Sequence, residues 1–137
     1  MKNRVPFFGL IAAAAMSMSL EASAQSLDPG SLLLYPEFDN REGVANALTI
    51  TNTNDTSVGT GYVEFVYIDE KTCLEFNRTV ELTPNDTLTV LTKFHNPEYE
   101  GGYVYLFAKN EAGEPIAFDW LIGNNMIIDG LGLWQYS

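Results

Sequence analysis

Short runs of β-branched and aromatic residues, separated by Gly, Pro, Asn and Asp, recur along the chain from residue 31 onward. Such residues favour strands, and turn signals about every 8–12 residues are typical of a β-sandwich or barrel. No helical spacing of apolar residues persists after the first 24 residues, and a parallel sheet would need helices as crossover connections. The pattern therefore predicts an all-β fold, an antiparallel two-sheet β-sandwich of the immunoglobulin-like kind with about 7–9 short strands.

Alternation within these runs predicts which side chains face the core. In residues 44–54, Leu48 and Ile50 fall on one face, and the neighbouring threonines fall on the other. Residues 103–109 are apolar on both faces, which indicates a central strand. Pro36 interrupts an apolar run near the start, so this strand is expected at an edge or at a bend.

Residues 73–82 alternate most regularly, with Cys73 on the polar face. Arg78 interrupts the apolar face of this run, which predicts a bulge or a strand end at that point. The stretch "NEAGEP" reads as a hairpin loop around Gly113, followed by a strand that begins at Ile116.

The first 24 residues have the pattern of an export signal. Lys2 and Arg4 precede an apolar run, and the small residues Ala22, Ser23 and Ala24 follow it. We expect cleavage after Ala24, so that the signal helix is removed and residues 25–137 form a single β-sandwich domain. No second apolar run is long enough to span a membrane. The expected location is the periplasm, the cell surface or the extracellular space.

The chain is acidic, with a net charge of −11. Removal of Lys2, Arg4 and Glu21 with the signal leaves five basic and seventeen acidic residues, a net charge of −12. Such a surface repels phosphate backbones and anionic lipids, so we expect no nucleic-acid partner. After signal removal we expect no membrane span. It attracts cations, but solubility of an exported protein is a sufficient reason for the charge.

Cys73 is the single cysteine of the chain. One cysteine cannot form an internal disulfide, so the fold must depend on its apolar core, although Cys73 could still join two copies into a homodimer. The cysteine and histidine spacings of zinc sites are missing, and we expect no cofactor.

The candidate catalytic residues are few. His95 is the only histidine, and it precedes Asn-Pro in a segment that reads as a turn, so we interpret it as a polar loop residue. A glycoside hydrolase needs two carboxylates across a cleft, and Asp119 and Glu98 are the candidates for such a pair. The sequence shows no nucleophile motif. We therefore expect that the protein is not an enzyme.

Candidate binding residues are aromatic or oxygen-rich. Tyr99, Trp134 and Tyr136 lie in a loop or near the end of the chain, where exposed rings could stack on sugars or form a protein interface. His95 and Asp119 complete this set of candidates. Three further residues supply oxygens of the kind that Ca²⁺ binds, although a turn whose side chains bond their own backbone is the favoured explanation: Asn52, Asn54 and Asp55.

Several segments carry a resemblance, among them "LLLYPEFDNREG", "NRTVELTPNDTLTVLTKFHNP" and "GGYVYLFAKNEAGEPIAFDWLIG". Over most of residues 32–130 the chain resembles an uncharacterised family of exported bacterial all-β proteins. The resemblance implies export and a β-rich domain, and it supplies no activity or catalytic residue. Similar proteins continue beyond the "IDG" segment, so an unpaired edge near Trp134 is expected to be open to partners.

These observations favour an exported non-enzymatic β-sandwich module with a binding or structural role at the cell surface or outside the cell. One alternative is a carbohydrate-active protein, either a sugar-binding module or a carboxylate-dependent glycoside hydrolase. Another is a subunit that donates a strand to a surface assembly through its terminal edge. The expected partners are therefore a glycan, a protein or a second copy of the chain, and the sequence does not choose among them.

Overall fold

Eight strands and one helical turn form the part of the chain that the computed structural model describes, residues 29–55, 61–130 and 132–136. The predicted signal peptide and its cleavage site lie outside these residues. The elements in chain order are β1 (Leu32–Asp39), β2 (Val44–Asn52), β3 (Gly61–Asp69), β4 (Glu75–Leu82), β5 (Thr87–Leu91), α1 (Thr92–His95), β6 (Gly101–Lys109), β7 (Leu121–Asp129) and β8 (Gly132–Tyr136).

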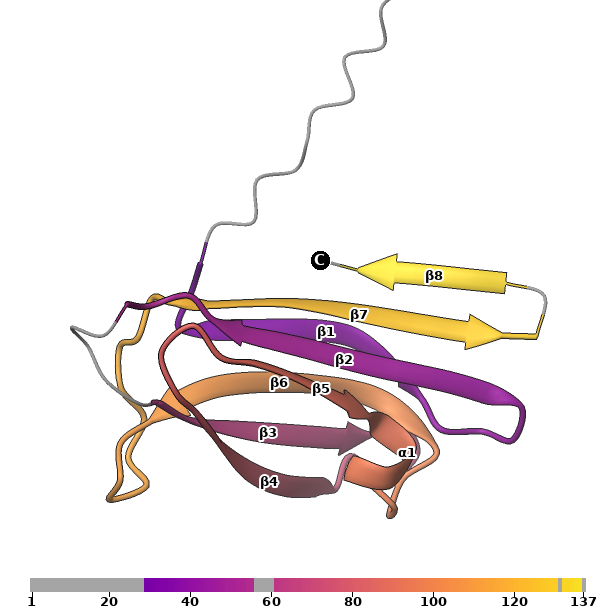
Figure 1. Cartoon of the computed structure of the whole chain (residues 1–137). Coiled ribbons are helices and arrows are strands. Elements are labelled where there is room, and N and C mark those ends of the chain that lie inside the picture. Colours follow the sequence, from indigo (N-terminus) through magenta and orange to yellow (C-terminus); the bar gives the residue numbers. More distant parts are fainter. Residues whose placement is uncertain (1–28, 56–60, 131, 137) are drawn as a thin grey trace, which may run out of the picture.

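The strands form two antiparallel four-stranded sheets that pack against each other, as Figure 1 shows. One sheet has the order β1-β6-β3-β4, and the other has the order β5-β2-β7-β8. The prediction of an all-β antiparallel two-sheet β-sandwich is therefore confirmed. The finer immunoglobulin-like assignment stays a prediction.

The core lies between the two sheets. Leu48 and Ile50 of β2 are fully buried, as are Val63 of β3 and Val104 and Leu106 of β6. Burial of each such side chain contributes about 1.5–3 kcal/mol, which is how a fold without an internal disulfide is stabilised. The predicted alternation in β2 is confirmed, because its buried residues recur at every second position.

Two predictions about strand position are also confirmed. β6 lies inside its sheet, between β1 and β3. β1 is the edge strand of that sheet, and its pairing with β6 shifts register between Tyr35 and Phe38, around Pro36. This irregularity pushes Pro36 and Glu37 out of the regular ladder, and a bulge of this kind bends a strand and re-aims its side chains.

Two predictions about the run from residue 73 to residue 82 are wrong. The pairing of β4 with β3 runs from Glu75 to Leu82 without a shift, so Arg78 marks no bulge. It lies on an edge strand, where its guanidinium reaches over the ring of Phe76, 5.5 Å from the centroid. Cys73 is not in a strand but in the preceding turn, exposed and with φ of 58°.

The segment after Gly113 also differs from the prediction. Gly113 does form a tight turn, with φ of 86°. The strand that follows begins at Leu121 rather than at Ile116, and it belongs to the other sheet. The predicted hairpin loop is confirmed, because Lys109 and Pro115 form an antiparallel bridge and the N–H of Ile116 donates to the backbone oxygen of Ala108 at 3.0 Å. The pairing ends there, and the chain then crosses to the other sheet. Sequence alternation detected the apolar residues of this segment but could not assign them to a sheet.

Helix is scarce in the described residues. α1 is four residues long, and of its residues only His95 falls in the segment that reads as a turn. None of the described helical residues form a segment with the length and apolarity of a membrane span.

Candidate binding surface

The bulge of β1 opens a groove of about 500 Å³ at one end of the sandwich. One wall consists of the bulge and the turn after it, with Glu37, Asp39 and Arg41. Glu70, just after β3, and the segment from Glu100 to Tyr103, at the start of β6, form the other wall. A smaller hollow of about 260 Å³ shares the first wall and continues to the sheet of β7 and β8, where it is lined by Ile127, Asp129 and Trp134.

The electrostatics of the groove centre on one ion pair. The Nε of Arg41 donates to both carboxylate oxygens of Asp39, at 3.0 and 3.1 Å, and its backbone N–H donates to Oδ1 at 3.0 Å. Hydrogen bonding to Arg41 lowers the pKa of Asp39 and outweighs the opposing effect of burial. The same bond raises the pKa of Arg41 above its usual value. Asp39 and Arg41 therefore neutralise each other at neutral pH.

Further carboxylates surround this pair. Glu100 accepts a hydrogen bond from Lys71 at 2.9 Å, which lowers the pKa of Glu100. The Glu70 side chain lies against the backbone of Gly101, where an added Cβ would meet its carboxyl atoms at 3.3 Å. Glu37 also lines the groove, and Asp129 lines the smaller hollow beside it. The groove thus presents negative charge with a single neutralised cation at its centre.

Two buried amides hold the bulge in place. Asn125 of β7 donates to the backbone oxygen of Glu37 at 2.7 Å. The side-chain oxygen of Asn46 accepts the backbone N–H of Asp39 at 3.1 Å, and its amide nitrogen donates to Asn125. Both asparagines are buried. Polar groups in the core therefore satisfy backbone groups that the bulge removes from the strand ladder, which fixes the first wall.

A second buried network holds the opposite wall. The amide nitrogen of Asn40 donates to the backbone oxygens of Asn96 and Tyr99, at 3.1 and 2.9 Å. The hydroxyl of Thr92 donates to the side-chain oxygen of Asn40 at 2.6 Å. These bonds tie the turn after β1 to α1 and to the loop that leads into Glu100. These bonds therefore connect the segments that carry the two walls of the groove.

An uncovered apolar surface begins where the groove ends. The outward-facing residues of β1 and β6 pair across the strands, Leu32 with Phe107 and Leu34 with Tyr105. Leu32 and Leu34 are 60% and 63% exposed, and Tyr103 is 42% exposed. We call these residues the apolar strip: Leu32, Leu34, Tyr103, Tyr105 and Phe107.

The apolar strip is continuous with the groove, and its aromatic rings contact one another. Tyr103 belongs both to the strip and to the groove lining. The rings of Tyr105 and Phe107 stack at 6.3 Å between centroids. Burial raises the pKa of Tyr105, with further contributions from Glu75 and Tyr103. Aromatic residues in alternate positions of β6 therefore form one row on the outer face of this sheet.

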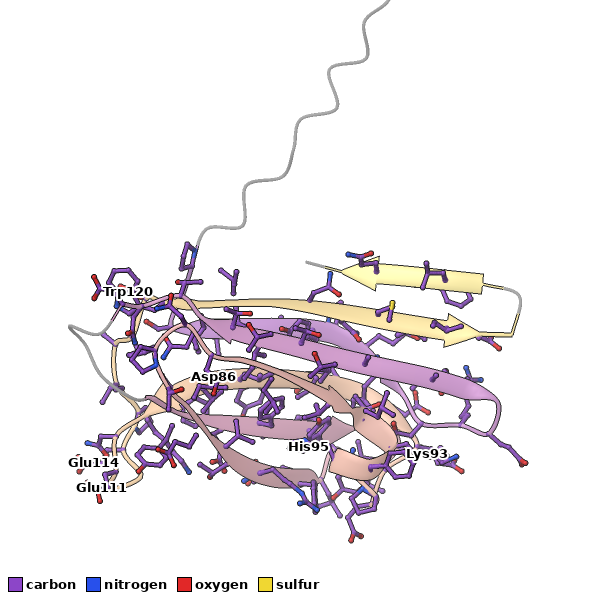
Figure 2. All side chains as sticks on the ribbon, in the orientation of Figure 1. Asp86, Lys93, His95, Glu111, Glu114 and Trp120 are labelled. Carbon is purple, nitrogen blue, oxygen red and sulfur yellow. The ribbon has the colours of Figure 1, made fainter. Side chains whose placement is uncertain are left out.

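His95 lies in α1 rather than in a loop, and its ring is half-buried. Its Nδ1 lies 2.9 Å from the hydroxyl of Tyr67, and its ring is 4.7 Å from that of Phe65. Burial, followed by the charge of Arg78, lowers the pKa of His95 to about 4. Figure 2 shows His95 at the α1 end of the sandwich, within the space between the strands. These contacts are those of a packed residue.

The predicted aromatic candidates have different surroundings. Tyr99 is half-buried against the core, and its hydroxyl donates to the backbone oxygen of Glu75 at 3.3 Å. Trp134 is 48% exposed on β8 and lines the smaller hollow. Tyr136 is the last residue of β8. Among the described strands β8 is at the edge of its sheet, so Trp134 lies on an edge strand.

The two carboxylates of the hydrolase alternative are not brought together. Asp119 accepts a hydrogen bond from the hydroxyl of Ser31 and immediately precedes Trp120. Glu98 follows α1 and lines a hollow whose lining does not include Asp119. In Figure 2, Trp120 and His95 lie at opposite ends of the sandwich. The pair named in the sequence therefore does not face a common cleft.

The calcium candidates lie at the end of β2. Asn52 and Asn54 are fully buried. The amide of Asn52 donates to the backbone oxygens of Leu82 and Thr83, and its side-chain oxygen accepts the N–H of Asn54 at 3.1 Å. Asp55 is exposed. In the described part of the chain, no group of three or more His, Cys, Asp or Glu side chains has a metal-binding arrangement.

The fold defines the class of the molecule as a two-sheet antiparallel β-sandwich. A search of solved structures finds a similar fold in the crystal structure of Thermotoga maritima 1070. The TM-score is 0.57 with 14% identical residues, over 79% of this chain and 90% of that chain. This likeness concerns the fold alone. No protein-family model and no curated protein matches the sequence.

Proposed function

We propose that the protein is an exported, non-enzymatic β-sandwich module that binds another macromolecule through the apolar strip and the adjoining groove. The observation that carries this proposal is the uncovered strip, with two leucines more than half exposed on a sheet face. Contiguous apolar surface of this kind marks interaction sites, because water contact with it is unfavourable. The fixed walls of the groove support the proposal, because a preformed site loses little entropy on binding.

A sugar-binding role is the second candidate. The row formed by Tyr103, Tyr105 and Phe107 favours it, because planar rings in alternate positions of one strand can stack on successive sugar rings. The polar groups of the groove could bond sugar hydroxyls. The strip also includes two exposed leucines, which contribute apolar contact but no stacking. This mixture is closer to the composition of a protein interface.

Export is tested by expressing the full chain in a bacterial host that exports proteins. We expect the recovered protein to have a mass that begins at Gln25, and to be found outside the cytoplasm. Recovery of the full-length mass from the cytoplasm would contradict the export part of the proposal.

Binding through the strip is tested with two variants of matched chemistry. Leu34→Ser removes an exposed leucine from the strip, and Leu133→Ser removes one from β8, which is equally exposed at 63%. Both are screened with the wild type against glycan arrays and against purified cell-surface proteins. We expect Leu34→Ser to lose the ligand that Leu133→Ser retains. A ligand that is lost only with Leu133→Ser would move the binding surface to the terminal edge.

A further inference from the structure

We infer that the partner is a basic protein segment, extended in shape, whose apolar side chains cover the apolar strip and whose cationic end group enters the groove. This inference rests on the proposed function and specifies the class of its ligand. It depends on charge complementarity and on the order in which the apolar and acidic surfaces follow one another.

The first argument is the polarity of the site along its length. Leu32, Leu34 and the aromatic row occupy the outer face of the sheet, and Tyr103 leads from that row into the groove. At that end the lining becomes acidic, with Glu70 on one wall and Glu37 on the other. A segment that covers both parts therefore needs apolar side chains followed by positive charge.

The second argument concerns the cations that the chain itself could supply. Three of its basic residues are engaged in ion pairs, Arg41 with Asp39, Lys71 with Glu100 and Lys109 with Glu64. Arg41 is the basic residue in the groove lining, and Asp39 already holds it. Two copies that met groove to groove would therefore bring one acidic lining against another. Like charges across an interface disfavour association, so a homodimer on this face is not the arrangement that the charges favour.

The third argument is that Glu70, a carboxylate of the groove, is not held in a direct ion pair. The Arg41 guanidinium is held by both oxygens of Asp39. Arg41 and Lys71 act on the charge of Glu70 only from a distance, because neither forms an ion pair with it among the described residues, and the Glu70 carboxylate lies against backbone at the groove wall. A lysine or arginine from a partner could therefore form a direct ion pair with Glu70. The bond would be charge-assisted and only partly screened inside the groove.

The test uses a synthetic extended peptide in which leucine and threonine alternate and two lysines follow at one end. A matched peptide has glutamines in place of the lysines. Binding to the mature protein is measured by calorimetry at low and at physiological salt. We expect the lysine peptide to bind and the glutamine peptide to bind about tenfold more weakly or not at all.

Two charge-matched variants separate the groove from the general acidity of the protein. Glu70→Gln removes a carboxylate from the groove, and Glu111→Gln removes one from a loop that Figure 2 shows at the opposite end from Lys93. Both change the net charge equally. We expect Glu70→Gln to lower the affinity for the lysine peptide about tenfold. We expect Glu111→Gln to change that affinity by less than about twofold. Equal effects would mean non-specific attraction and would overturn the inference.

Other outcomes also decide the matter. Equal binding of the two peptides, or binding of neither, would overturn the inference that the partner is basic. A glycan that binds the wild type but not Leu34→Ser would also overturn that inference, while the proposed binding surface would stand. Dimerisation that disappears with Leu34→Ser would replace the basic partner with a second copy. A ligand whose affinity is the same for the wild type and for Leu34→Ser would instead contradict the proposed function itself.

Discussion

At the scale of single residues, His95 shows how burial overrides a sequence signal. A lone histidine near Glu98 and Glu100 suggests chemistry, yet its ring packs between Phe65 and Tyr67. The carboxylates beside it in sequence do not determine its pKa. The causes of the lowered pKa are burial and the positive charge of Arg78.

The lowered pKa of His95 predicts a loss of stability in mild acid. The unfolded chain binds a proton with a pKa of about 6.5, and the folded chain binds it with a pKa of about 4. The unfolded state therefore holds more protons between these values, so the free energy of unfolding falls as pH falls through this window and is unaffected by His95 above it. Because the ring is partly exposed, we expect a loss on the order of 1–2 kcal/mol.

Urea unfolding at pH 7 and pH 5 measures this effect. The His95→Gln variant is the control, because its stability should change less over the same interval. NMR titration gives the pKa directly, since the chain has one histidine and therefore one imidazole signal. A titration midpoint near 6.5 would show that the ring is not packed as described.

At the scale of elements, the edge strand β1 is shaped by residues from other strands. Its bulge is satisfied by Asn46 of β2 and Asn125 of β7. Alternation in β2 places Asn46 on the same face as Leu48 and Ile50, which was the available signal that a polar residue points inward. Its role could not be read from that signal, because its partners are far away in sequence.

Replacement of Asn125 tests this support. Asn125→Leu removes the donor to the Glu37 backbone oxygen and the acceptor for Asn46, which leaves buried polar groups without partners. We expect a loss of about 2–3 kcal/mol in the free energy of unfolding, measured by chemical denaturation. Asn124→Leu, on the opposite face of β7, is the control and should cost less than about 1 kcal/mol. Similar costs would mean that the amides do not hold the bulge.

Gly102 lies in β6 where this strand pairs with both β1 and β3. Its φ is 152°, and an added Cβ would lie 1.9 Å from the backbone oxygen of Ile68. We expect Gly102→Ala to cost about 3 kcal/mol or more, because neither the φ nor the contact can be relieved without separating paired strands.

Gly30→Ala is the matched control for this substitution. Its added Cβ would meet the Leu32 backbone oxygen at an ordinary 3.5 Å. We expect its midpoint of urea denaturation to lie close to that of the wild type. A Gly102→Ala variant as stable as this control would show that the strand junction is adaptable.

At the scale of the whole molecule, net charge and the exposed thiol make opposing predictions about self-association. The net charge of −11 keeps copies apart, so we expect the reduced protein to be a monomer by light scattering. Cys73 is exposed in a turn, so mild oxidation is expected to join two copies.

Non-reducing electrophoresis and light scattering measure this difference. The Cys73→Ser variant should stay monomeric after the same oxidation. A dimer that persists in Cys73→Ser would instead indicate association through the edge of β8, which is the other homodimer that the sequence suggests.

The sequence by itself determined the fold class, the face of β2 that is buried, the central position of β6 and the edge position of β1. These properties follow from local periodicity, because the side chains of a strand alternate between its faces and proline removes a ladder donor. The same local rules failed at Arg78 and after Gly113, where the outcome depended on which strand paired with which.

Only the tertiary structure decided the groove, the apolar strip and the supports beneath them. Asn125 and Glu37 are 88 positions apart in sequence, and Leu34 meets Tyr105 only through the pairing of β1 with β6. Strand pairing depends on the balance of many distant contacts, and a pattern within one strand carries no information about its neighbour. The candidate binding residues were therefore assembled by topology, from side chains that no local motif connects.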